Sequence, residues 1–124
     1  MARILFVDDS RDTADSYATL FKMLGHETAV AYNGEQGVEA AAAFAPDISF
    51  IDLEMPMMDG FEAASAFRER LGRDSILVAV TGRDRSQVRG QPAGAAFDGY
   101  LQKPVAASDL VAMVEALPRA ALYR

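Results

Sequence analysis

The fold is decided by the stretch Asp47-Ile48-Ser49-Phe50-Ile51-Asp52-Leu53-Glu54-Met55-Pro56. Residues 48–51 are a short apolar run, rich in β-branched and aromatic side chains, which is typical of a buried strand. Asp52 ends this run, and ligand sites in parallel α/β sheets lie at the carboxyl ends of the strands. Because an ionised carboxylate is costly to bury alone, we expect other parts of the chain to supply its partners.

Composition limits the class of protein. With 124 residues, 51% of them hydrophobic, the chain suits one domain over residues 1–124 with a sizeable core. It has no cysteine, no recognisable signal peptide and no apolar run near the roughly 18 residues that cross a bilayer. We therefore predict a cytoplasmic protein with no membrane partner. A formal net charge of −6 disfavours direct binding of nucleic acid.

The remaining elements alternate along the chain. Continuous apolar runs predict further strands at residues 3–7 and 76–80. Residues 27–32 alternate, as an edge strand would, and residues 99–101 are predicted as a short fifth strand. Helical spacing of apolar side chains predicts helices at residues 11–24, 34–44, 61–71 and 108–117, with Leu24 and Ala45 on their inward faces. Their predicted N-terminal caps are Ser10, Asn33, Asp59 and Ser108.

Residues 83–97 occupy the place of a fourth helix but are poorly suited to one. Gly90 and Gly94 each cost about 1 kcal/mol relative to Ala within a helix, and Pro92 costs about 3 kcal/mol. We predict that any helix is confined to residues 84–89 or is absent, with residues 90–94 irregular.

This alternation predicts an α/β fold of the flavodoxin-like (βα)5 type. Short connections and right-handed crossovers give a doubly wound, five-stranded parallel sheet, most simply in the order 2-1-3-4-5. That order places the ends of the first and third strands side by side. Asp8, Asp9 and Asp52 would then meet in one crevice.

Three carboxylates in one crevice repel one another, and the sequence offers two ways to compensate. An all-oxygen site with room for water suits Mg²⁺. Lys103, after the fifth strand, adds an ammonium group, and Thr81, at the end of the fourth, adds a hydroxyl. A metal, an ammonium, a hydroxyl and a carboxylate nucleophile together can receive a phosphoryl group as an aspartyl phosphate on Asp52.

At this point the sequence resembles the receiver domain of two-component response regulators. The resemblance covers nearly the whole chain and rests on four segments in the family's order and spacing: Val7-Asp8-Asp9-Ser10, Ile51-Asp52-Leu53-Glu54-Met55-Pro56-Met57-Met58-Asp59-Gly60, Thr81-Gly82 and Lys103-Pro104. The segments at Thr81-Gly82 and Gly99-Tyr100-Leu101 look most like receivers attached to, or partnered with, hybrid histidine kinases.

The resemblance implies a role for each site residue. Asp52 would be the phosphoacceptor, with Lys103 paired to the phosphoryl group. Asp9, Asp52 and the backbone carbonyl of Glu54 would ligate Mg²⁺, and Asp8 would contribute largely through water. Thr81, Leu53 and the amide of Gly82 would bind the phosphoryl oxygens, and Tyr100 would be the switch aromatic that turns inward when Thr81 moves. The Lys103-Pro104 bond is usually cis in this family.

The resemblance also implies partners. The phosphoryl donor would be a histidine kinase or a histidine phosphotransfer protein, and no turnover of an external substrate is expected. Nothing after Leu117 could form an output domain, so the effector would be a separate protein, unless the chain is a fragment of a longer one.

Other interpretations remain open from the residues alone. Asp8 and Asp9 could cap a helix, and Lys103 could be a solvated surface charge. An aspartyl-phosphate hydrolase combines similar residues, but its nucleophile comes early in the chain and its acid pair last. A flavodoxin needs a hydroxyl- and glycine-rich first loop, whereas residues 8–12 are acidic. Assays for bound flavin and for phosphate-ester turnover separate these classes. His26, the only histidine, is expected at the surface.

Overall fold

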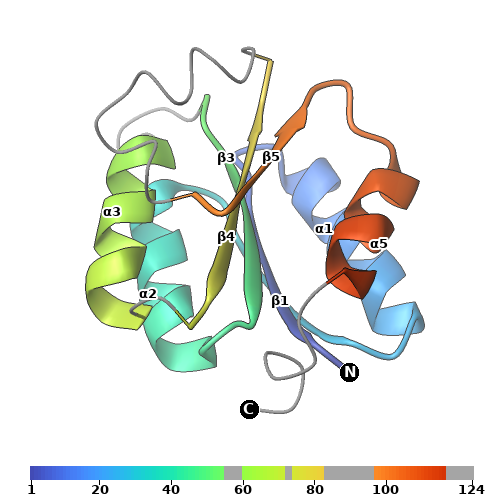
Figure 1. Ribbon diagram of the computed structural model, residues 1–124, viewed down its shortest axis with the longest axis horizontal. Coiled ribbons are helices and arrows are strands. Elements are labelled where there is room, and N and C mark those ends of the chain that lie inside the picture. Colours follow the sequence, from blue (N-terminus) through green and yellow to red (C-terminus); the bar gives the residue numbers. More distant parts are fainter. Residues whose placement is uncertain (55–59, 72–73, 83–96, 117–124) are drawn as a thin grey trace.

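The computed structural model describes residues 1–54, 60–71, 74–82 and 97–116, and the central feature of these residues is a parallel five-stranded sheet (Figure 1). The strands are β1 (Arg3–Val7), β2 (Glu27–Ala31), β3 (Ile48–Asp52), β4 (Ile76–Thr81) and β5 (Gly99–Gln102). They lie in the order β2-β1-β3-β4-β5, and every neighbouring pair is parallel. The predicted fold class and strand order are therefore confirmed.

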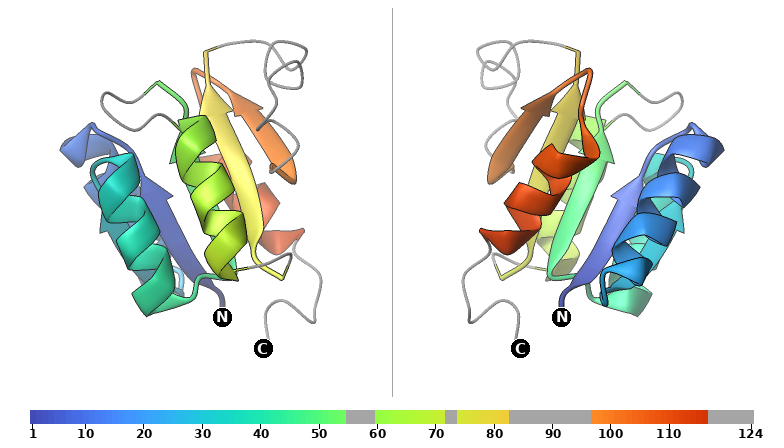
Figure 2. Two further views of the ribbon diagram at one scale, coloured as in Figure 1. Left: turned by 90° about the vertical axis from the view of Figure 1, so that its left-hand side faces the viewer. Right: turned by 90° about the vertical axis from the view of Figure 1, so that its right-hand side faces the viewer.

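The structure describes four helices, which cover the two faces of this sheet. They are α1 (Arg11–Met23), α2 (Gly34–Phe44), α3 (Gly60–Leu71) and α5 (Ala107–Glu115). Helices α2 and α3 lie on one face and α1 and α5 on the other (Figures 1 and 2). None of the helices in the described part of the chain has the length and apolar character that crossing a membrane requires.

The alternation of side chains along the strands builds two separate cores. Leu5, Val7 and Ile51 pack beneath α2 and α3, where Phe67 is completely buried. The residues that alternate with these on the same strands, such as Phe6 and Phe50, face α1 and α5 and form the second core together with Phe21 of α1. Because both faces are covered, the central strands β1 and β3 are buried along almost their whole length, whereas the edge strand β2 is only half-buried.

Most helix ends follow the signals in the sequence. Ser10 accepts a hydrogen bond from the Thr13 amide (3.4 Å), and Asn33 Oδ1 accepts one from the Gln36 amide (2.8 Å). At the end of α1 the chain turns through Gly25, whose φ of 95° is readily adopted only by glycine.

Three local predictions were wrong. Helix α5 begins at Ala107, so Ser108 lies inside it; the Ala106 amide at its start is satisfied by Asp109 Oδ2 (3.1 Å) instead. Leu24 and Ala45 are exposed because each lies at the C-terminal cap, where the chain has already left its helical path. Ala45 adopts a left-handed φ of 51°. The predicted cap Asp59, the fourth-helix region at residues 83–96 and Leu117 lie outside the described residues.

Candidate functional site

Asp52 is the last residue of β3 and is only 3% exposed. Its Oδ1 accepts hydrogen bonds from the Lys103 ammonium (3.1 Å) and from the Glu54 amide (3.0 Å). A carboxylate buried here needs a partner, and Lys103 provides the opposite charge.

Lys103 is held in place by the neighbouring strand. Its backbone amide donates to the Thr81 carbonyl (2.7 Å), which extends the pairing of β4 with β5, and its peptide bond to Pro104 is cis. Burial lowers the pKa of Lys103, but its hydrogen bond to Asp52 and the negative charges of Asp52, Asp8 and Glu54 together outweigh that effect and leave the pKa above its ordinary value. The ammonium therefore stays charged beside Asp52.

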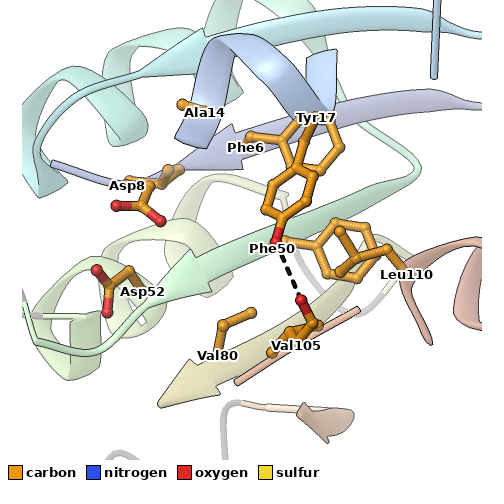
Figure 3. Close-up of a pocket in the computed structure, with 10 residues that line it drawn as sticks. Phe6, Asp8, Ala14, Tyr17, Phe50, Asp52, Val80, Val105 and Leu110 are labelled. Carbon is orange, nitrogen blue, oxygen red and sulfur yellow. Dashed lines mark hydrogen bonds between the residues drawn. The ribbon is translucent and has the colours of Figure 1, made fainter. Parts of the chain in front are cut away.

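Asp8 and Asp9 follow β1 directly, and the order of the strands brings them to Asp52. Each of the three residues offers a carboxylate oxygen, and these oxygens lie within 4.8 Å of one another. Figure 3 shows Asp8 and Asp52 together at the ends of β1 and β3. Burial raises the pKa of Asp8 to about 6; a hydrogen bond from the Ser10 amide opposes this, and the charge of Asp52 adds to it. The repulsion predicted from the sequence is present at Asp8.

The donor set of this cluster fits a hard divalent cation. Carboxylate oxygens are the ligands that Mg²⁺ prefers, and it is bound through few of them with water completing its shell. The cluster opens into a cleft lined by Asp8, Asp9, Asp52, Glu54 and Lys103, among others, so water can reach it. Among the described residues, these three acids form the group that could hold a metal ion.

Thr81, the last residue of β4, is completely buried, and its hydroxyl donates a hydrogen bond to Glu54 Oε1. The other carboxylate oxygen of Glu54 lies 3.8 Å from the Lys103 ammonium. Only the backbone carbonyl of Glu54 was predicted to take part in the site, and the contacts of its side chain were not predicted. No local signal marks this contact, because Glu54 and Thr81 are 27 residues apart.

A comparison with family models decides the assignment. The model of the response regulator receiver domain matches residues 4–115. The chain belongs to the response regulator receiver family. It is thus a signalling module of two-component systems, as its sequence motifs predicted.

Curated relatives of this receiver domain are longer proteins. It is 36% identical over 119 residues to the response regulator MprA of Mycobacterium ulcerans. The alignment covers 94% of this chain but 50% of that protein. The chain therefore spans about half the length of the curated relatives it matches.

Solved structures of other receivers share the fold. The chemotaxis protein CheY4 of Vibrio cholerae has a TM-score of 0.85 at 23% identity, and the alignment covers 95% of this chain and 99% of that one. The response regulator TrrA of Thermotoga maritima, solved in complex with Mg²⁺-BeF, has a TM-score of 0.79 at 28% identity, with 93% and 97% covered.

Of the other predicted site residues, Leu53 and Gly82 directly follow Asp52 and Thr81 in sequence, and Tyr100 packs in the cluster of Leu53 and Ala79. Leu53 is buried, its amide donates to the Val80 carbonyl (3.1 Å), and its side chain packs with Ala79 and the half-buried Tyr100. Gly82 is exposed, with open space where a Cβ would lie. The roles of Leu53, Gly82 and Tyr100 stay predictions.

His26 takes no part in this site. It is half-buried at the turn between α1 and β2, and its Nδ1 accepts a hydrogen bond from the Ala2 amide (2.9 Å). Burial lowers its pKa. It is therefore a structural residue and not a fully solvated one.

Proposed function

We propose that the chain is the phosphoacceptor module of a two-component phosphorelay, in which Asp52 takes a phosphoryl group from a histidine kinase or a histidine phosphotransfer protein. The observation that carries the proposal is the burial of Asp52 at the end of β3, against Lys103 and within reach of two further carboxylates. A downstream effector, either a separate protein or an attached domain, would then respond to the conformation of the receiver domain.

In the proposed reaction a carboxylate oxygen of Asp52 attacks the phosphorus of a phosphohistidine. A new O–P bond forms while the P–N bond breaks, and the electron pair of that bond returns to the imidazole. Lys103 lies beside Asp52 and would neutralise charge on the phosphoryl oxygens, and the Thr81 hydroxyl would donate to one of them.

Asp9, Asp52 and the carbonyl of Glu54 would hold Mg²⁺, with Asp8 contributing through water. When bound, Mg²⁺ supplies positive charge that offsets both the acidic cluster and an incoming phosphoryl group. The Mg²⁺-BeF complex of the Thermotoga maritima relative supports this assignment by analogy.

Intact mass spectrometry tests the proposal. After incubation with Mg²⁺ and acetyl phosphate, we expect the wild type to gain one labile phosphate, and Asp52→Asn to gain none. Asp12→Asn is the matched control, because Asp12 is an exposed residue in the first turn of α1. A label that persists in Asp52→Asn would refute Asp52 as the acceptor.

A further inference from the structure

The side chain of Glu54 contacts both the Thr81 hydroxyl and the Lys103 ammonium, the two groups that we propose to bind the phosphoryl oxygens. One of its carboxylate oxygens accepts a hydrogen bond from the Thr81 hydroxyl, and the other lies 3.8 Å from the Lys103 ammonium. The backbone amide of Glu54 donates to Asp52 Oδ1 (3.0 Å), so the residue is also tied to the proposed phosphoacceptor.

The Thr81 hydroxyl cannot serve two acceptors at once. A hydroxyl has a single hydrogen to donate, and here that hydrogen is given to Glu54. Thr81 is completely buried, and a buried hydroxyl needs an acceptor close by. A carboxylate resembles a phosphoryl group in presenting neighbouring, negatively charged oxygens to the same hydroxyl and ammonium.

We infer that the Glu54 carboxylate mimics the phosphoryl group in the unphosphorylated protein. Its oxygens occupy the positions on Thr81 and Lys103 that phosphoryl oxygens would take, until a phosphoryl group displaces them. The inference rests on the proposed function and deepens it. Glu54 is thereby a residue that opposes phosphorylation, in addition to any contribution of its backbone carbonyl to the metal site.

The exposure of the Glu54 and Lys103 side chains is consistent with a contact that a phosphoryl group can displace. The side chains of Glu54 and Lys103 are 39% and 41% exposed, so solvent screens their attraction, and Glu54 has open water to move into. Thr81, in contrast, stays buried and must exchange one acceptor for another. Phosphorylation would then release Glu54 into solvent while Thr81 remains inside.

Binding of beryllofluoride at saturating Mg²⁺ tests the inference, with the affinity measured by ¹⁹F NMR. Removing a competing occupant raises the apparent affinity by a factor equal to the reciprocal of the fraction of molecules that it had left unblocked. We expect roughly three- to tenfold tighter binding for Glu54→Ala. Glu54→Gln should gain less, because its amide oxygen still accepts from Thr81. Glu39→Ala, which removes an exposed charge on α2, should match the wild type.

The contact itself has a readout without metal or anion. In the unmodified protein the NMR signal of the Thr81 methyl group should shift in Glu54→Ala and not in Glu39→Ala. An unshifted signal, or unchanged beryllofluoride affinity in Glu54→Ala, would overturn the inference. Equal gains in the Ala and Gln variants would assign the effect to charge alone and would also overturn it. Failure of the wild type to bind beryllofluoride would instead count against the proposed function.

Discussion

Among the residues that the structure describes, two serines are buried, and the hydroxyl of one of them has a hydrogen-bond partner. Ser75 Oγ donates to the Pro46 carbonyl (2.7 Å), whereas Ser49 Oγ, in the middle of β3, has no hydrogen-bond partner among the described residues. A buried hydroxyl without a partner costs about 1–3 kcal/mol, and a satisfied one contributes about 1 kcal/mol. Otherwise similar residues therefore affect stability in opposite directions.

We predict that Ser49→Ala raises the free energy of unfolding by about 1 kcal/mol and that Ser75→Ala lowers it by a similar amount. Urea denaturation of the two variants measures both changes against the wild type. Ser75→Ala is the matched control, since it removes the same atom from another buried position. A loss of stability in Ser49→Ala would mean that its hydroxyl is satisfied.

Asp8 makes the stability of the metal-free protein depend on pH. Its pKa is about 6 in the folded protein against 3.8 for an ordinary aspartate. A group whose pKa is raised by folding stabilises the fold when it is protonated, and that contribution is lost as pH rises through the folded pKa. The loss is therefore expected between about pH 4 and pH 7.

We predict that Asp8→Asn, which stays neutral and can still accept from the Ser10 amide, gains stability over the wild type as pH rises through about 6. Denaturation curves recorded without Mg²⁺ between pH 4.5 and pH 7.5 measure the difference. Asp12→Asn should show no such trend. A constant difference between Asp8→Asn and the wild type would contradict the raised pKa.

At the scale of elements, two aspartate side chains accept hydrogen bonds from backbone amides near the starts of neighbouring strands. Asp47, just before β3, accepts from the Arg3 amide of β1 (2.9 Å). Asp98, just before β5, accepts from the Leu77 amide of β4 (2.9 Å) and pairs with Arg68 of α3. In both cases the carboxylate accepts a hydrogen bond from a strand amide at the end of the sheet that lies opposite the site.

We predict that Asp98→Ala lowers the free energy of unfolding by about 1–3 kcal/mol, because the Leu77 amide loses its side-chain acceptor and Arg68 loses its ion pair with Asp98. Asp98→Asn should lose less, since an amide oxygen can still accept from Leu77. Urea denaturation measures the loss of stability, and amide exchange at Leu77 locates it. Unchanged protection of Leu77 in Asp98→Ala would contradict this role.

At the scale of the whole molecule, the acidic cluster opposes folding and the metal would reverse that effect. Asp9 is exposed and contributes one of the clustered carboxylates. Removing it relieves like-charge repulsion but also removes a proposed ligand. A ligand that binds only the folded state stabilises it in proportion to its occupancy.

We predict that Asp9→Ala has a higher Tm than the wild type without Mg²⁺ and a lower Tm than the wild type in excess Mg²⁺. Thermal unfolding in chelator and in Mg²⁺ measures both, with Asp12→Ala as the control for removing an exposed acid. If Mg²⁺ stabilised Asp9→Ala as much as the wild type, the assigned metal site would be wrong.

The sequence by itself determined the architecture of this receiver domain. Apolar runs of strand length, alternating with helical spacing, predicted all five strands and the four described helices close to their observed bounds. It also predicted that Asp8, Asp9 and Asp52 would meet, because the ends of β1 and β3 are neighbours in this strand order. These features follow from burial patterns that repeat over a few residues, and such patterns can be read along a chain.

The tertiary structure decided which polar side chains meet across the fold. No local signal in the sequence marks the contact of Glu54 with Thr81 or the hydrogen bond from the Leu77 amide to Asp98. The same holds for Ser49, whose hydroxyl has no partner among the described residues. The start of α5 is a further example, because the Ala106 amide is satisfied by Asp109 and not by a cap at Ser108. A hydrogen bond depends on distances of a few tenths of an ångström between residues far apart in sequence, and only the packing of helices on the sheet sets those distances.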